Sequence, residues 1–526
     1  MKYTSNRHAL GGALAGLLLT LCAGSSARAQ IAIPPVDPQP PGAVIGLPVP
    51  PAQSPPVYQS APITLPQSLP ELQPQPLGIG APMPIGSAVP LTAAPKLDDK
   101  PKFDINWNNG VFFQTANKNF SFHAGATVHY DSAWYQATPI LQLAPGGTGR
   151  FQDGTNMRRA RFFMEGTFYE AVDYKLELEF MNGIGFSPAG TQNAIVPGSV
   201  TNSPGPTDAW ITIKDVPFVG NVRIGSQKEW FSLEHLNSYR YLEFMERSYL
   251  FDFSQPTAFN NGFSPGISMF RTWLDDRMFS AIGAYKNESD LIGFGLGNGQ
   301  YAVTGRLAFL PIWEPDDHLF WHLGGAMSHR DPVNGQVQIR LRDDIRNAPF
   351  PLLNLVANTG LINVHSQDLY NIETAAVWGP LTLQAEYTAN VLNGASVGTG
   401  PNLGNLFFQA YYAEALLFLT GESRTWNTKN FFFNRVTPKH PLKFKHDECD
   451  GYGWGAWELG LRYTYVDLSN GPIQSGRLDA VTVGLNWYLN ANSKIQFNYD
   501  MTHRGDTNTA AEGVIHAFGT RLAFDF

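Results

Sequence analysis

The sequence is poor in cysteine, in charged residues and in long apolar runs. It contains 2 cysteines, Cys22 and Cys449, and 15% of its 526 residues are charged. So few cysteines give no spacing for a cysteine zinc site and no framework of disulfides. After residue 29 no apolar run reaches the ~18 to 20 residues that a membrane-spanning helix needs. These absences exclude a zinc-stapled domain, a disulfide scaffold and transmembrane helices in the remainder of the chain.

The first 29 residues have the pattern of a secretory signal peptide. Lys2 and Arg7 precede an apolar run that ends at Leu21, and Ala27-Arg28-Ala29 gives a small-residue cleavage site. A lipid anchor at Cys22 is the alternative, but Leu21 stands where a small residue is expected. Removing the signal peptide takes away 3 of 36 basic residues and none of 44 acidic ones, so the net charge changes from -8 to 33 minus 44, or -11. Cys449 is then the only thiol.

Residues 30–100 differ in composition from everything that follows. Proline recurs every few residues, charges are almost absent, and apolar residues show no periodic spacing. Such a segment cannot bury enough apolar surface to fold, and proline favours an extended chain of about 3.1 Å per residue. We therefore predict a disordered periplasmic linker with a reach of roughly 200 Å. A contact with the cell wall or another partner is the alternative role for this arm.

Residues 101–526 contain stretches of about ten residues in which apolar and polar residues alternate, separated by turn residues. In RRARFFMEGTFY, residues 158–169, one face carries Ala160, Phe162, Met164 and Phe168, and the other carries Arg159, Arg161, Glu165 and Thr167. Because successive side chains of a strand point to opposite faces, each such stretch predicts a strand with one apolar and one polar face. Sixteen stretches qualify: 120–134, 158–169, 174–182, 208–214, 221–228, 267–274, 278–287, 301–313, 318–330, 369–379, 381–392, 406–421, 457–468, 478–489, 493–502 and 516–526.

The connections between these stretches alternate between short and long. Gly379-Pro380 is short, whereas the segments 229–266 and 331–368 on the opposite side are long. An even number of strands, with short turns on one side and long loops on the other, is typical of an outer-membrane β-barrel. We predict an all-β fold: a transmembrane antiparallel β-barrel of about 16 strands with outer-membrane lipid around it. The final stretch, RLAFDF, then ends on a lipid-facing strand with Leu522, Phe524 and Phe526 on one face.

Several stretches together resemble one family of porins. They are the strand 158–169, the segment NVRIGSQKEWFSLEHLNSYRYLEFMERSYL (221–250), GAWELGLRYTYVDL (455–468) and GLNWYLN (484–490). On these residues the chain resembles the phosphate-selective porin O and P family from about Phe103 to Phe526. The resemblance implies a sixteen-stranded porin, a homotrimer, a third extracellular loop that narrows the channel, and a terminal Phe526 read by the outer-membrane assembly machinery.

The resemblance also directs attention to basic residues of the lumen, because phosphate-selective members line their pores with arginines and lysines. Alternation and loop position give these pore-lining or anion-contact candidates: Arg159, Arg161, Lys175, Arg223, Lys228, Arg240, Arg247, Arg306 and Arg462. Acidic residues share the same faces, among them Glu165, Glu177, Glu179, Glu386 and Glu458, and Arg521 also points inward. The inward arginines therefore have two interpretations, as anion contacts or as partners in salt bridges of the wall.

One connection breaks the alternation of loop lengths. Residues 422–454 fall on the short-turn, periplasmic side, yet the segment is long and basic, with Arg424, Lys429, Arg435, Lys439, Lys443 and Lys445. Two hypotheses remain open for it. It folds into the lumen as a constriction, or it stays outside as a loose periplasmic loop.

Three functions follow from different classes. The first is passive diffusion of small hydrophilic solutes, with inorganic anions such as phosphate as candidates. The second is a structural anchor, tied to the cell wall by the proline-rich arm. The third is an outer-membrane enzyme, for which the sequence shows no nucleophile with a base on one barrel wall. We expect no cofactor, no metal, no catalytic residues and no nucleic-acid partner, and we predict localisation in the bacterial outer membrane with an N-terminal periplasmic segment.

Overall fold

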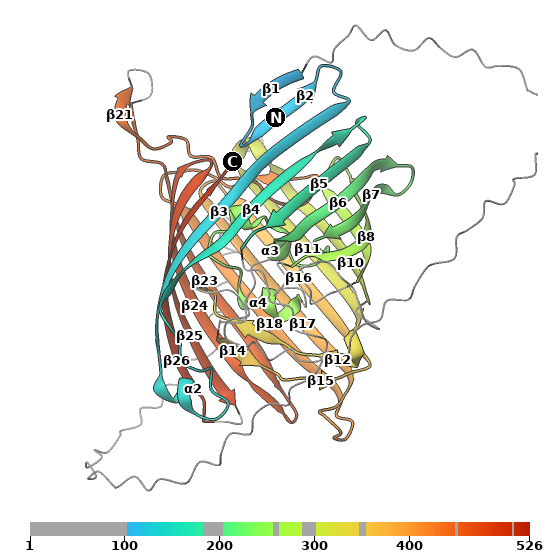
Figure 1. Ribbon diagram of the computed structural model, residues 1–526, viewed down its shortest axis with the longest axis vertical. Coiled ribbons are helices and arrows are strands. Elements are labelled where there is room, and N and C mark those ends of the chain that lie inside the picture. The colour runs from blue at the N-terminus through green and yellow to red at the C-terminus, as the bar shows by residue number, and fades with distance from the viewer. Residues whose placement is uncertain are drawn as a thin grey trace, which may run out of the picture. The chain divides into compact units, whose positions relative to one another are not determined.

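The computed structural model describes residues 103–181, 204–255, 262–286, 301–346, 354–447, 451–507 and 510–526. The chain divides into two units, residues 1–99 and 100–526, and the description below concerns the second. The predicted signal peptide and linker lie outside the described residues, so they stay predictions. In the second unit one antiparallel sheet of eighteen strands dominates (Figure 1).

Sixteen of these strands close into a barrel, and the other two, β1 and β2, extend the sheet outside it. Each barrel strand pairs with the next one along the chain, and β26 pairs with β3 to close the ring. The barrel strands are β3 (Phe120–Ala137), β4 (Gly154–Phe168), β5 (Val172–Glu179), β6 (Gly205–Val216), β7 (Gly220–Gln227), β8 (Ser264–Trp273), β9 (Met278–Lys286), β10 (Tyr301–Glu314), β11 (Leu319–Asp331), β16 (Ser366–Trp378), β17 (Leu381–Ala395), β18 (Gly404–Phe418), β23 (Ala456–Asn470), β24 (Ile473–Asn490), β25 (Ser493–Thr507) and β26 (Gly513–Asp525).

Every predicted strand coincides with one barrel strand, so the fold prediction is confirmed. The two faces of the wall also follow the predicted alternation. On β16, Ile372 points outward and is 67% exposed, whereas its neighbours Asn371 and Glu373 point inward and are buried. A closed ring leaves no unpaired edge, which is what a sheet in hydrocarbon requires.

The last residues of the chain complete the closure. Phe526 donates its backbone N–H to the carbonyl of Ala126 at 2.9 Å and accepts the Ala126 N–H at 2.8 Å. Gly125 has no side chain to obstruct this, since a Cβ there would lie 1.8 Å from the Phe526 carbonyl oxygen. Leu522, Phe524 and Phe526 all face outward, as the alternation predicted.

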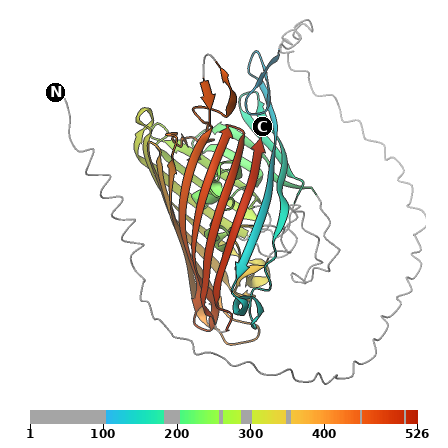
Figure 2. The ribbon, with the colours of Figure 1, turned by 90° about the vertical axis from the view of Figure 1, so that its left-hand side faces the viewer.

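The hairpin of β1 (Phe103–Trp107) and β2 (Val111–Thr115) was not predicted. It pairs with the start of β3, at the end of the barrel where the short turns lie (Figures 1 and 2). Each strand has only five residues, and so short a stretch gives too few alternating positions to be recognised in the sequence.

Long-loop segments fold back inside the barrel. They contain short strands, β12 (Gln336–Val337), β13 (Arg340–Arg342), β14 (Leu355–Asn358) and β15 (Ile362–Asn363), and the short helix α4 (Tyr249–Ser254). Their apolar side chains pack on the inner wall of β17 to β26 in the largest hydrophobic cluster of the described residues; its members include Leu250, Phe253, Leu341, Val356, Phe408 and Leu478. This part of the lumen is therefore filled by protein.

Helices of the described residues are few and short. Besides α4 they comprise α2 (Pro139–Leu143), α3 (Leu233–Leu236) and the 3₁₀ turns Tyr239–Tyr241, Pro315–Asp317 and Val333–Gly335. In the described part of the chain, none is long and apolar enough to cross a membrane.

Candidate functional site: the constricted lumen

The segment 228–255, between β7 and β8, folds into the lumen. Its helix α3 begins at Ser232, whose side chain accepts the N–H of His235, and the following turn begins at Ser238 in the same way. Side chains from Trp230 to Gln255 are almost all buried. The prediction from family resemblance that this loop narrows the channel agrees with this placement.

Glycines on the inner wall make room for this loop. A Cβ on Gly460 of β23 or on Gly484 of β24 would lie 3.0 Å from the ring of Phe244. A Cβ on Gly519 of β26 would lie 2.8 Å from the sulfur of Met245. The inner face is thus shaped to hold the middle of the loop against β23 to β26.

Next to these contacts, four guanidinium groups surround one carboxylate, that of Glu246. Nitrogen–oxygen distances to it are 2.9 Å from Arg158, 3.0 Å from Arg159, 2.8 Å from Arg521 and 3.7 Å from Arg346. Burial alone raises the pKa of Glu246, but Arg158, Arg159 and Arg521 outweigh burial and hold this pKa well below its usual range. We call Arg158, Arg159, Arg346 and Arg521 the basic cluster.

Consecutive residues of β4 both reach the basic cluster because the strand has a bulge. His129 of β3 pairs with Arg159 and Tyr130 pairs with Met157, so Arg158 has no opposite residue. A bulge interrupts the alternation of faces, and both arginines enter the lumen. Strict alternation places only Arg159 there, which is why the sequence did not indicate Arg158.

The opposite balance of charge exists around Arg462 of β23. Its guanidinium lies 2.8 Å from Asp344 and 3.4 Å from Glu234, and the carboxyls of Glu414 and Asp500 are close enough to act on the same charge. Burial raises the pKa of Asp344 to about 8, although Arg462 opposes this. We call Glu234, Asp344, Glu414 and Asp500 the acidic cluster. Acids outnumber bases here, and bases outnumber acids around Glu246.

The connection 419–455 has two parts. Its first part enters the lumen, as one hypothesis for this segment held, and its later part lies outside the barrel, as the other held. Arg424 enters the lumen and bridges Glu243 of the loop at 2.6 Å and Glu458 of the wall at 3.1 Å. Trp426 and Phe433 pair as the short strands β19 (Trp426–Asn427) and β20 (Phe432–Phe433), and they pack with Phe431 on inner-wall residues of β9, β11 and β16. The later strands β21 (Lys443–Asp447) and β22 (Gly451–Gly453) form a hairpin that projects beyond the barrel end (Figures 1 and 2). We call residues 424–433 the inner plug.

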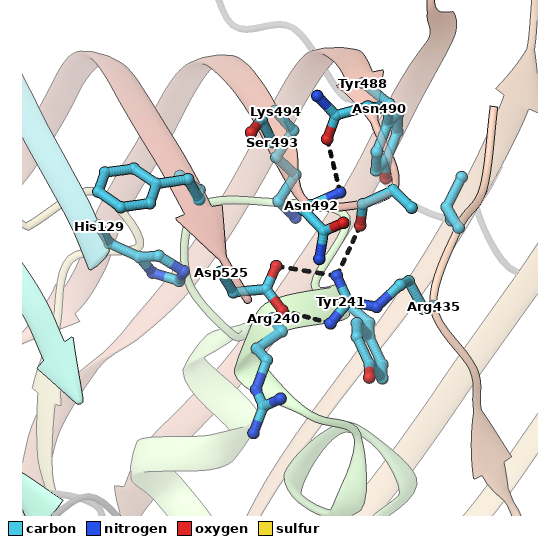
Figure 3. Close-up of a pocket in the computed structure, with 14 residues that line it drawn as sticks. His129, Arg240, Tyr241, Arg435, Tyr488, Asn490, Asn492, Ser493, Lys494 and Asp525 are labelled. Atoms are coloured by element: carbon cyan, nitrogen blue, oxygen red, sulfur yellow. Dashed lines mark hydrogen bonds and ion pairs between the residues drawn. The ribbon is translucent and has the colours of Figure 1, made fainter. Parts of the chain in front are cut away.

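A small pocket opens beside the inner plug at the short-turn end of the lumen (Figure 3). Its lining includes His129 and the charged residues Arg240, Arg435, Lys494 and Asp525. Arg435 forms an ion pair with Asp525 and donates to the Ala491 carbonyl. Lys494 donates to the Leu242 carbonyl at 2.7 Å. Cations therefore exceed acids in this lining.

Most predicted pore-lining residues lie against carboxylates. Arg161 contacts Glu179 at 2.7 Å and Glu177 at 2.9 Å, and Arg306 contacts Glu373 at 2.5 Å. The remaining paired candidates are Arg159 with Glu246, Lys175 with Asp208 and Glu165, Arg240 with Glu177, and Arg462 with Asp344 and Glu234.

Three predicted residues have no carboxylate within ion-pair distance among the described residues: Arg223, Lys228 and Arg247. Arg223 donates to the hydroxyl of Thr212 at 3.0 Å and lies 4.0 Å over the ring of Trp210. Arg247 donates to the carbonyls of Glu234 and Asn237, each at 2.7 Å.

Lys228 contacts the same turn of the loop as Arg247, at residues 234–237. It donates to the carbonyls of His235, Leu236 and Asn237 at 2.7, 3.2 and 2.9 Å. Burial and the charge of Arg247 lower the pKa of Lys228, whereas the three carbonyl contacts favour its ammonium form. Arg223 and Lys228 remain partly exposed, so both retain access to water.

The chain was compared with protein families, with individual proteins and with solved structures. The family described as phosphate-selective porin O and P matches residues 144–526. Porin O of Pseudomonas aeruginosa is 23% identical over 447 residues, covering 80% of this chain and 92% of that protein. A Caulobacter vibrioides protein is 26% identical over 433 residues, covering 80% of this chain and 77% of its own length. Among solved structures, an anion-selective porin from Comamonas acidovorans covers 77% of this chain and 100% of its own, with 13% identity and a TM-score of 0.42.

Proposed function

The chain belongs to the phosphate-selective porin O and P family, and on that premise we propose that it passes small anions, phosphate among them, in preference to cations. It is an outer-membrane channel for small hydrophilic solutes. The observation that supports anion preference is that Arg223, Lys228 and Arg247 form no ion pair with a carboxylate of the described residues, and instead donate to hydroxyl and carbonyl oxygens. An anion that reaches the partly exposed Arg223 or Lys228 exchanges water for fixed donors without displacing an ion-paired carboxylate.

The other cations of the lumen have a different role in this proposal. Arg161 and Arg306 hold wall carboxylates at close distance, and breaking such buried pairs is costly, so they shape the channel rather than bind solute. We also propose that the channel assembles as a homotrimer and that residues 30–100 form its periplasmic linker.

The test is the reversal potential of the purified protein in planar bilayers across a potassium chloride gradient. We expect discrete conductance steps and a reversal potential of the sign given by chloride permeation, with added phosphate reducing the chloride current. Absence of steps, or the sign given by potassium permeation, contradicts the proposal.

A matched pair of variants locates the effect. Arg223→Gln removes a lumen cation. Arg271→Gln removes an arginine on the outer face of the neighbouring strand β8, where the guanidinium lies 4.3 Å from the centre of the Trp273 ring. A unit charge at ~10 Å in water is worth ~0.4 kcal/mol, or about twofold in permeability ratio. We expect Arg223→Gln to lower the chloride-to-potassium ratio about twofold and Arg271→Gln to leave it unchanged. Equal effects of the two variants remove Arg223 from the path.

A further inference from the structure

The hairpin β1–β2 continues the wall beyond the closed barrel. β26 ends where Asp525 pairs with Thr127 of β3. Beyond this point β2 pairs with the same edge of β3, with Val111 opposite Ala124. The ring of Trp107 stacks on that of the terminal Phe526 at 6.1 Å. Among the described residues β1 pairs only with β2, so the hairpin forms a two-stranded wing at the periplasmic end of the barrel (Figures 1 and 2).

The wing has two different faces, and the register shows which face of the barrel each one continues. Ile105 lies opposite Phe113, and Phe113 lies opposite Phe122, an outward residue of β3. The apolar face therefore continues the lipid-facing surface; its members are Phe103, Ile105, Trp107, Val111 and Phe113. The other face carries Asp104, Asn106 and Gln114 together with Phe112, whose ring lies 6.3 Å from that of His123, and it continues the inner face at His123.

The apolar face is left uncovered by the described residues. Phe103, Ile105 and Trp107 are 56%, 66% and 63% exposed, and no charged side chain lies on this face. A contiguous apolar patch on a strand next to a free edge is an aggregation hazard in water. Aromatic side chains of this kind are instead favoured at the boundary between acyl chains and headgroups.

We propose that the β1–β2 hairpin is a lipid-binding element, whose apolar face lies in the headgroup boundary of the inner leaflet of the outer membrane. The continuity of this face with the lipid-facing wall at Phe122 and Phe526 identifies the partner as phospholipid. Asp104 and Asn106 then face the periplasm and the barrel mouth. The hairpin would thereby hold the start of the barrel against the membrane.

Site-directed spin labels distinguish the occupants of this face. In a Cys449→Ser background of the secreted protein, Ile105→Cys labels the apolar face and Asn106→Cys labels the opposite face of the same strand. Ile211→Cys, on the outward face of β6 at 46% exposure, sets the value for a lipid-embedded site. The proteins are reconstituted in vesicles of phosphatidylethanolamine and phosphatidylglycerol, and collision with oxygen is compared with collision with a water-soluble nickel complex.

We expect the label at position 105 to favour oxygen, as at position 211, and the label at position 106 to favour nickel. Two outcomes overturn the proposal. Equal nickel access at positions 105 and 106 means that the wing stands in water. Dipolar broadening at position 105 that disappears on dilution with unlabelled protein means that a second copy of the chain covers the face.

Discussion

Single side chains in this lumen experience very different electrostatic surroundings within one constriction. Glu246 is held ionised by the basic cluster, whereas Asp344 is buried among the other acids of the acidic cluster with Arg462 and Arg346 as the nearby cations. Burial also raises the pKa of Glu234, which shares Arg462 with Asp344. Because a carboxyl that must stay protonated couples folding to pH, this cluster makes the packing of two loops sensitive to proton concentration.

The direction of this pH effect follows from the pKa of Asp344. Between its ordinary value of 3.8 and its folded value of about 8, the folded protein retains a proton that the unfolded chain releases. Stability therefore falls as pH rises through this window, and the fall from this group ends above about pH 8. We expect the thermal midpoint in detergent to drop less from pH 5 to pH 9 in Asp344→Asn than in the wild type.

The control is Asp215→Asn, which alters an exposed aspartate near the end of β6 and should retain the full drop. Parallel midpoint curves for Asp344→Asn and the wild type would show that Asp344 does not carry the effect.

At the scale of elements, the inner plug ties the loop 228–255 to the barrel wall from the periplasmic side. Arg424 bridges the loop and β23, and the N–H of Phe433 donates to the side chain of Asn237 in the loop at 3.1 Å. Trp426, Phe431 and Phe433 are each at most 5% exposed, so the plug is fixed by packing as well as by charge. Removing it should both widen the lumen and loosen the loop.

We therefore expect replacement of residues 426–433 by a Gly-Ser stretch of equal length to increase single-channel conductance in planar bilayers. Each large aromatic lost from a core costs about 3–5 kcal/mol, so thermal stability should fall as well. The matched control replaces the β21–β22 hairpin in the same connection, which lies outside the lumen and should change neither quantity. Unchanged conductance in the first variant would mean that the plug does not limit the path.

At the scale of the whole molecule, the closed ring separates an apolar outside from a polar inside. Ile372 lies on the outward face near the middle of β16, and Ser366 begins the same strand on the same face. Placing a cation in the hydrocarbon is costly at the bilayer centre and almost free near its surface. The position of a residue along the strand, and not its type alone, should decide the cost of a charge.

Accordingly, Ile372→Arg should reduce the free energy of unfolding by about 2–4 kcal/mol, and Ser366→Arg by about 0–1 kcal/mol. Denaturant titration in lipid vesicles, followed by tryptophan fluorescence, measures both. Similar costs at the two positions would place the membrane boundary elsewhere on the barrel.

The sequence alone determined the barrel because alternation is a local property. Each strand from Phe120 onward carries its own apolar and polar faces, and a sheet that must bury one face in lipid keeps that pattern whatever its neighbours are. The long basic connection near Arg424 was also visible as an exception. Wall glycines such as Gly460 can also be read from the sequence. Their role, which is to leave room for the ring of Phe244, follows only from the structure.

Only the tertiary structure decided what fills the barrel and which charges meet. The partners Arg462 and Asp344 are 118 residues apart, and Arg521 and Glu246 are 275 apart, so no local spacing connects them. The bulge that brings Arg158 inward depends on how β4 pairs with β3, and the short hairpin at Phe103 depends on how β2 pairs with the start of β3, and neither pairing is visible in the pattern of one strand alone. The alternation within a strand depends only on consecutive residues. Contacts across the lumen join residues far apart in the chain, and they form only when the ring has closed.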